Sequence, residues 1–386
     1  MSNPSGLPVG APGSASLGTK GTTRTGPGQR LASRDHRRVL KRAQRALTEG
    51  RASRLCYLSS SGAVTVTVGQ LLVAHVSGVH RCGSIWNCPL CAPVVRQGRA
   101  RDIDAAASVV LASGGCGLFV SYTGPHRKFD PLGPLFDLTA RFGDLTMRGA
   151  KGKRFRVDLG MLGMIRALEV TYGRPPFDNG WHPHGHVLFL FDRQLTAAEV
   201  AAFRSFLWGR WDGALRKAGF GALHPVRGLD CRPVFDTAGL AQYTTAVEDG
   251  WGVGLELARA DLKHRGVTPM ELLARWALDG ESQEGLLARM LWKEYEAVTF
   301  RRRCIQWTPG LRKRLIPDAE ELSDQELAAA EGEDEVLVSV QVLAEEWNLL
   351  VRRGEVAAVL RQIEEMAALC LLLSGQVGNE RVMACG

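Results

Sequence analysis

The stretch Trp181-His-Pro-His-Gly-His-Val-Leu-Phe-Leu-Phe191 places three histidines at alternate positions of one apolar segment. Side chains of a β-strand point to opposite faces in turn, so the three histidines are predicted to share one face with Leu188 and Leu190. The Pro, Val and Phe residues of the run then form a core face. Imidazole is the commonest nitrogen ligand of metals, and the rings of His184 and His186 can converge on one ion. The run therefore predicts a metal-binding strand, against the alternative of one core histidine and two solvated ones.

A partner strand is predicted over residues 162–172, joined to the histidine strand by the turn-rich stretch 173–180, as in a hairpin with a longer loop. Glu169 is the only acidic residue of this strand, and a carboxylate in an apolar run is costly unless it is paired or bound to a metal. We expect Glu169 to be a third ligand of Mg²⁺ or Mn²⁺, whose remaining positions fall to water and phosphate oxygen. His182 is expected to complete the shell or to contact DNA. The alternative for Glu169 is an ion pair with Arg166.

The cysteines predict a second, structural metal site. Cys88 and Cys91 form a Cys-x-x-Cys knuckle with Cys82 six residues upstream, a spacing that wraps a tetrahedral Zn²⁺, and the fourth ligand would be Cys56 or His80. A closed thiolate shell leaves no position for substrate, so this zinc would stabilise the fold. A redox motif would need a thioredoxin-like context, and cysteines buried without metal are the remaining alternative. Nine cysteines, an odd count in a long chain, argue against a disulfide framework.

The net charge of +8 hides a strong asymmetry. Residues 318–386 hold 15 acidic and 4 basic residues, a balance of −11, so the other 317 residues have a balance of +19. So strong a positive charge on residues 1–317 indicates a polyanionic partner, and nucleic acid is the first candidate. Of the 48 basic residues 39 are Arg, which suits bidentate phosphate contact and equally reflects a GC-rich genome. No run approaches a bilayer span and the N-terminus lacks a secretory pattern, so we expect a cytoplasmic protein without a membrane partner.

Strands interleaved with helices, including one hairpin, favour an α+β fold on an antiparallel sheet. The expected organisation is a disordered, basic N-terminal segment (1–50) with an amphipathic helix over 34–50, a zinc-binding module and helix (51–115), a sheet domain (116–260), a helical extension (261–317) and an acidic helical tail (318–386). Strands are expected within 55–80 and at 116–123, and helices at about 92–112, 131–147, 196–218, 237–247, 322–330 and 336–373.

Tyr243 lies on the helix predicted over 237–247, shortly after the sheet. A phenolate that attacks phosphorus forms a covalent tyrosyl-phosphate and keeps the phosphodiester energy for rejoining. From spacing alone, a buried core tyrosine remains the alternative.

These features in this order resemble the HUH endonuclease family and, within it, the rolling-circle replication initiators of high-GC Gram-positive plasmids and integrative elements. HUH denotes two histidines separated by one residue on a strand, here His184-Gly-His186. The resemblance covers residues 55–315 approximately and rests on Cys82-Gly-Ser-Ile-Trp-Asn-Cys88-Pro-Leu-Cys91, Ala167-Leu-Glu-Val-Thr171, Gly180-Trp-His-Pro-His-Gly-His186, Leu291-Trp-Lys-Glu-Tyr295 and Trp307-Thr-Pro-Gly-Leu-Arg312.

The resemblance implies an antiparallel-sheet HUH nuclease domain that binds Mg²⁺ or Mn²⁺ and nicks one strand of origin DNA. The tyrosine would stay on the 5′ end and leave a free 3′-OH. His184 and His186 are implied as ligands, Glu169 as the third and Tyr243 as the nucleophile, with Tyr172 the next candidate. The implied partners are origin DNA, single-stranded DNA and a host helicase or polymerase.

Two positions depart from the family pattern. Many relatives carry a lysine three residues after the tyrosine, where this chain has Ala246, and some carry a glutamate four residues before it, where this chain has Gly239. Asp236 and Glu248 lie nearby, and Gly124-Pro-His126 resembles the family's first motif. The alternatives are an HUH transposase or conjugative relaxase, and a non-enzymatic, zinc-stapled DNA-binding regulator. The absence of a Gly-x-x-x-x-Gly-Lys-Ser/Thr loop argues against a relaxase–helicase.

Overall fold

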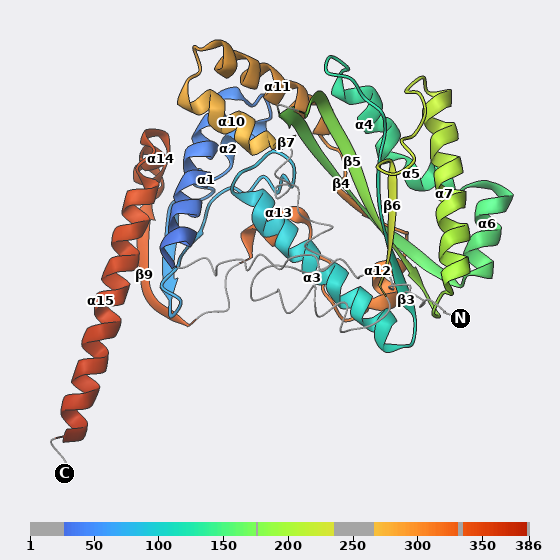
Figure 1. The fold of residues 1–386 in the computed structure, drawn as a ribbon. Coiled ribbons are helices and arrows are strands. Elements are labelled where there is room, and N and C mark those ends of the chain that lie inside the picture. The colour runs from blue at the N-terminus through green and yellow to red at the C-terminus, as the bar shows by residue number, and fades with distance from the viewer. Residues whose placement is uncertain (1–26, 175–176, 235–265, 331–334, 384–386) are drawn as a thin grey trace, which may run out of the picture.

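The computed structural model describes residues 27–174, 177–234, 266–330 and 335–383, which form an α+β fold with two antiparallel sheets (Figure 1). The larger sheet has the strand order β6-β3-β5-β4-β7, and β8 pairs with β4. Its strands are β3 (Cys116–Thr123), β4 (Met161–Arg174), β5 (Phe177–Phe191), β6 (Leu229–Val234), β7 (Gly266–Val267) and β8 (Ile305–Trp307). The antiparallel α+β arrangement predicted from the sequence is confirmed.

The central hairpin of this sheet is β4–β5, the pair predicted from the turn-rich stretch between the two strands. Along β5 the side chains alternate between two cores, as expected from the period of a strand. Val187, Phe189 and Phe191 enter a core beneath α7 (Ala197–Lys217), whereas Leu188 and Leu190 enter a core beneath α3 (Cys91–Ala112). The histidines therefore lie on the α3 side of the sheet.

Helices cover both faces of the large sheet (Figure 1). On one face lie α4 (Leu132–Ala140), α5 (Phe142–Met147), α6 (Gly149–Asp158) and α7; on the other lie α3 and α12 (Leu311–Leu315). The first turn of α7 is fixed by a capping box in which Thr196 and Glu199 satisfy each other's backbone N–H groups. The single helix expected over 131–147 is instead two helices that meet at Arg141.

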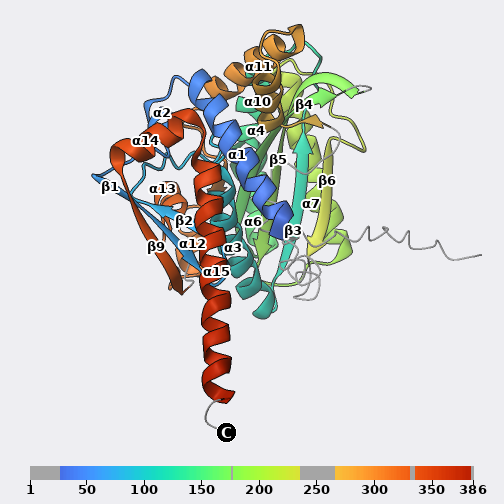
Figure 2. The same cartoon turned by 90° about the vertical axis from the view of Figure 1, so that its left-hand side faces the viewer.

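The smaller sheet pairs strands from the N-terminal part of the chain with a strand from its C-terminal part (Figure 2). It has the order β2-β1-β9, from β1 (Ala63–Gly69), β2 (Ala74–Ser77) and β9 (Val336–Leu343). Beside it lie α1 (Pro27–Leu47), α2 (Arg51–Leu55), α14 (Ala344–Arg353) and α15 (Val356–Met383). The valines of β1 pack against Trp347, Leu360 and Ile363, so this unit has its own core.

The helix expected across 336–343 is wrong, because this segment is strand β9 and runs antiparallel to β1. Its sequence, Val336-Leu-Val-Ser-Val-Gln-Val-Leu343, places valine at every second position, and β-branched residues favour a pleated strand when a partner edge is present. The acidic C-terminal region is thus not helical throughout.

A fourth core links the cysteine-rich segment to the large sheet. It contains Trp86 and Trp181 together with Trp292 and Tyr295 of α11 (Gln283–Thr299), which lies beside α10 (Pro269–Leu278). Tyr295 donates its hydroxyl to the carbonyl of Trp86 at 3.0 Å. These contacts hold the cysteine segment against the end of the hairpin that bears the histidines.

Candidate functional site

The register of the β4–β5 hairpin brings three predicted ligands together. Glu169 stands directly opposite His184, and Ala167 stands opposite His186. The Nε2 atoms of His184 and His186 lie 2.7 and 3.5 Å from Glu169 Oε2. One ligand atom from each residue falls within 4.8 Å of the others, and all three side chains are buried. We call this group the Glu–His–His triad.

The triad has the donor set of a divalent metal site. Both ring nitrogens of His184 are buried and, among the described residues, neither makes a hydrogen bond, although Nε2 is close to Glu169. Such a ring is costly to bury unless another group completes its interactions. Two imidazole nitrogens and one carboxylate oxygen fit Mn²⁺ or Mg²⁺ with open positions.

Arg166, the alternative partner considered for Glu169, makes contacts with other residues. Arg166 is three residues away, so alternation along β4 directs it to the opposite face. Its guanidinium donates to the carbonyl of Ala140 and, at 2.8 Å, to Gln306 Oε1.

The electrostatics of the triad favour an ionised carboxylate. Burial opposes ionisation of Glu169, but the adjacent rings of His184 and His186 outweigh it and hold the pKa of Glu169 well below its ordinary value. The ionised carboxylate is the form that a metal requires.

Two residues of β3 hold His186 in place. Ser121, which pairs with His186 in the register, has its Oγ 2.8 Å from His186 Nδ1, and the ring of Phe119 stacks on the imidazole with centroids 5.4 Å apart. A hydrogen bond to the second ring nitrogen fixes the orientation of a metal-binding histidine. The sequence reasoning missed Ser121, because its position becomes visible only once β3 is paired with β5.

A cleft of about 1360 Å³ opens at the triad. His184 lies on its wall together with His182, whose Nδ1 is 3.3 Å from Nε2 of His126. Other lining residues are Thr123, His224, Arg227, Arg232 and Asn179. His182 is not one of the three converging residues and lines the cleft beside His126 instead. The cleft combines histidines, arginines and room for a large ligand.

The predicted nucleophile, Tyr243, lies outside the described residues, as do its expected helix over 237–247 and positions Gly239 and Ala246. Tyr172, the next candidate, packs edge-on against Trp181, with ring centroids 5.1 Å apart, in the core that contains Leu168 and Val170. By strand alternation this is the face opposite Glu169.

The structure also brings together Cys56, Cys82, Cys88 and Cys91, which we call the cysteine cluster. The Sγ atom of Cys56 lies 3.7 Å from that of Cys88 and 3.6 Å from that of Cys91, and Cys82 Sγ lies 3.8 Å from Cys91 Sγ. A tetrahedron of Zn–S bonds of about 2.3 Å has edges of about 3.8 Å, so the spacing fits zinc. The other candidate for the fourth position, His80, is exposed and is not part of the cluster.

A buried basic group, Lys41, acts on the cysteine cluster through its charge. Lys41 is only 2% exposed, and its Nζ donates to Gln44 Oε1 and to the carbonyl of Ser53. Although burial raises the pKa of Cys88, hydrogen bonds from the other thiols and the charge of Lys41 lower it well below its ordinary value. Cys88 thus favours the thiolate, the form that binds zinc, whereas hydrogen bonds with neighbouring thiols and burial raise the pKa of Cys82 and of Cys91.

Among the described residues, no helix combines the length and the apolar character that a bilayer crossing requires.

Comparison with known proteins assigns the chain to a family. No protein-family model matches it, and no solved structure is found to match it. It is 32% identical over 372 residues to the protein rep of Streptomyces lividans, a match that covers 81% of this chain and 79% of the relative. It is 30% identical over 138 residues to the neomycin resistance protein of Streptomyces cyanogenus, covering 29% of this chain and 31% of that protein. Because the first similarity extends over most of both chains, this chain belongs to the family of Rep proteins.

Proposed function

We propose that this Rep protein is a plasmid replication initiator that nicks and rejoins one strand of origin DNA by metal-dependent chemistry of the HUH type. The observation that carries the proposal is the buried Glu–His–His triad at a cleft that also presents Arg227 and Arg232. The basic balance of the chain before residue 318 supports a nucleic acid as the ligand.

The proposed reaction is a phosphoryl transfer to tyrosine. The phenol oxygen of Tyr243 forms a bond to the scissile phosphorus and loses its proton, while the bond from phosphorus to the 3′ oxygen breaks. That oxygen leaves as a 3′-OH, and the phosphotyrosine keeps the 5′ end. Bound Mg²⁺ or Mn²⁺ would polarise the phosphate and stabilise the charge that grows on its oxygens.

The residues that the structure describes would orient the DNA and the three metal ligands. Ser121 and Phe119 keep His186 in one orientation, and the β4–β5 register keeps Glu169 beside His184. Guanidinium groups bind phosphate bidentately, so Arg227 and Arg232 would hold the strand along the cleft. The cysteine cluster would hold structural Zn²⁺ through Cys56, Cys82, Cys88 and Cys91, in a site separate from the triad.

Nicking of a supercoiled plasmid that carries the cognate origin tests this proposal. Purified protein is expected to convert it to the open-circular form with Mn²⁺ and not with EDTA. A non-enzymatic DNA-binding regulator would bind the plasmid and leave it supercoiled. A transposase or relaxase would nick DNA of another mobile element, so a plasmid without the origin and one with transposon-end or transfer-origin DNA complete the comparison.

A further inference from the structure

A second pocket, separate from the cleft, gathers arginines on the smaller-sheet unit. Arg34, Arg37 and Arg38 of α1 line it together with Arg81 and His75. The rest of the wall comes from the side chains or backbone of Tyr57, Ala74, Val76, Leu90, Val94, Ala328 and Ala330. Figure 1 places α1 across the molecule from β6, whose residues Asp230 and Arg232 line the cleft.

Two arginines of this pocket pair with carboxylates, and a third is held by uncharged groups. Arg34 pairs with Glu364 at 3.0 Å, and Arg38 pairs with Asp35 at 2.8 Å. Arg81 is held differently, since it donates to the carbonyl of Val76 at 2.7 Å and lies over a tyrosine ring with 5.3 Å between its Cζ and the centroid. A carbonyl and a ring orient the guanidinium without cancelling its charge.

The pocket has a volume of about 190 Å³, below the range of about 300–1000 Å³ typical of sites for drug-sized molecules. A volume of this size accommodates a group such as phosphate. Guanidinium forks match the oxygens of phosphate in pairs, and the carboxylates of Glu364 and Asp35 pair with Arg34 and Arg38 and not with Arg81. The positive charge of the pocket and its small volume thus both fit a phosphate group.

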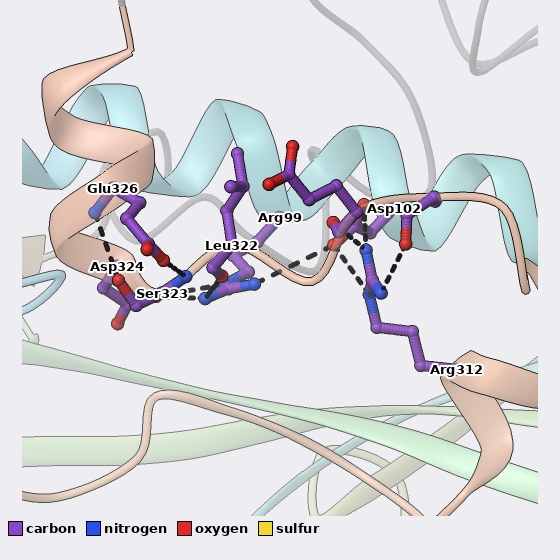
Figure 3. A network of polar contacts seen from close by, with 9 residues as sticks. Arg99, Asp102, Arg312, Leu322, Ser323, Asp324 and Glu326 are labelled. Carbon is purple, nitrogen blue, oxygen red and sulfur yellow. Dashed lines mark hydrogen bonds and ion pairs between the residues drawn. The ribbon is translucent and has the colours of Figure 1, made fainter.

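One wall of the pocket is fixed by a polar clasp around α13 (Asp324–Ala329) (Figure 3). Arg312 forms a bidentate pair with Asp102 of α3 at 3.1 and 3.2 Å, and Arg99 pairs with Asp324 at 2.7 Å. A capping box between Ser323 and Glu326 starts α13. The clasp ties the acidic C-terminal region to α3 and holds the helix that supplies Ala328 to the pocket.

We propose that the arginine pocket (Arg34, Arg37, Arg38 and Arg81) binds a backbone phosphate of DNA at a point away from the nicking cleft. The proposal rests on the function proposed above and adds to it a duplex contact. The cleft would take the strand that is cut, while the arginine pocket would take a phosphate of the flanking origin duplex. Such a contact adds affinity and orientation and does not read sequence.

The test compares Arg81→Gln with wild type for binding to origin duplex, measured by fluorescence anisotropy over a series of salt concentrations. Loss of one phosphate contact is expected to weaken binding about tenfold and to reduce the slope of log Kd against log salt by about 0.9. Arg81→Lys keeps the charge and loses the fork, so it is expected to keep the slope and to lose part of the affinity. Arg154→Gln, which removes an exposed arginine of α6, is the matched control and is expected to retain the wild-type affinity and slope.

Because Arg81 precedes a residue of the cysteine cluster, zinc content and melting temperature are measured for each variant, and Arg37→Gln on α1 repeats the test if Arg81→Gln fails to fold. Nicking of a short single-stranded oligonucleotide, which reaches only the cleft, is expected to be unchanged.

A wild-type affinity and slope in the folded variant would overturn the proposal. So would an Arg81-dependent thermal shift with inorganic phosphate while duplex binding stays normal, because the pocket would then bind free phosphate. Failure of wild type to nick the oligonucleotide would refute the proposed function instead, and the duplex titration would still decide the pocket.

Discussion

Gly185, between the two histidines of the triad, is expected not to tolerate a side chain. A Cβ atom at this position would lie 2.2 Å from Tyr122 Oη, 2.3 Å from its Cζ and 2.7 Å from its Cε1. The tyrosine ring cannot retreat, because it stacks on Phe142 with centroids 3.7 Å apart and donates its hydroxyl to the carbonyl of Thr139 at 3.0 Å. Substitution by alanine must therefore displace a buried ring or distort the hairpin.

The cost of Gly185→Ala follows from these contacts. Overpacking a filled core costs about 1–3 kcal/mol, and a buried hydroxyl and carbonyl that lose each other cost about 1–3 kcal/mol more. We expect a loss of about 3 kcal/mol in the free energy of unfolding, which corresponds to a fall in melting temperature of about 5–10 °C.

Differential scanning calorimetry of Gly185→Ala and Gly213→Ala measures this effect. At Gly213, on α7, a Cβ would meet no atom within 4 Å, so alanine is expected to raise the free energy of unfolding by about 0.5–1 kcal/mol through helix propensity. Equal melting temperatures for Gly185→Ala and wild type would refute the packing described around Tyr122.

Three further substitutions test other parts of the molecule. Cys88→Ser is expected to lose its zinc, as measured by elemental analysis, and several kcal/mol of stability. The control Cys370→Ser, at an exposed cysteine, is expected to keep both the zinc and the stability. Finding no zinc in the purified wild-type protein would contradict this prediction. Tyr243→Phe is expected to abolish the covalent protein–DNA adduct on denaturing gels while DNA affinity is retained, and an undiminished adduct would point to another nucleophile. Asp102→Ala removes the carboxylate partner of the nearly buried Arg312 and is expected to lower the free energy of unfolding by about 2 kcal/mol in urea titrations; an unchanged midpoint would show that the clasp in Figure 3 does not contribute to stability.

Local sequence patterns predicted the part of the fold that depends on neighbouring residues. The alternation around His184 and the turn before it were enough to predict the β4–β5 hairpin, and the hairpin register then places Glu169 opposite that histidine. The knuckle at Cys88 was visible in the same way, since its ligands are close in sequence.

Long-range pairing was the part that the sequence did not reveal. Strand β9 was read as helix although its valines alternate, because its partner β1 is far away in the chain and the surrounding acidic segments favour helix. The choice between Cys56 and His80 was open for a similar reason, since only folding brings Cys56 onto the knuckle. Ser121 was missed because its role depends on the pairing of β3 with β5.

Mn²⁺-dependent nicking by His184→Ala and His186→Ala tests whether the triad binds a catalytic metal. The origin plasmid is incubated with each variant, with wild type and with His36→Ala, an exposed histidine of α1 outside both metal sites, over a range of Mn²⁺ concentrations. Both triad variants are expected to lose nicking at every Mn²⁺ concentration while they keep most of the DNA affinity, and His36→Ala is expected to behave as wild type. Normal nicking rates in both triad variants, or nicking by wild type that persists in EDTA, would contradict a metal-dependent nuclease.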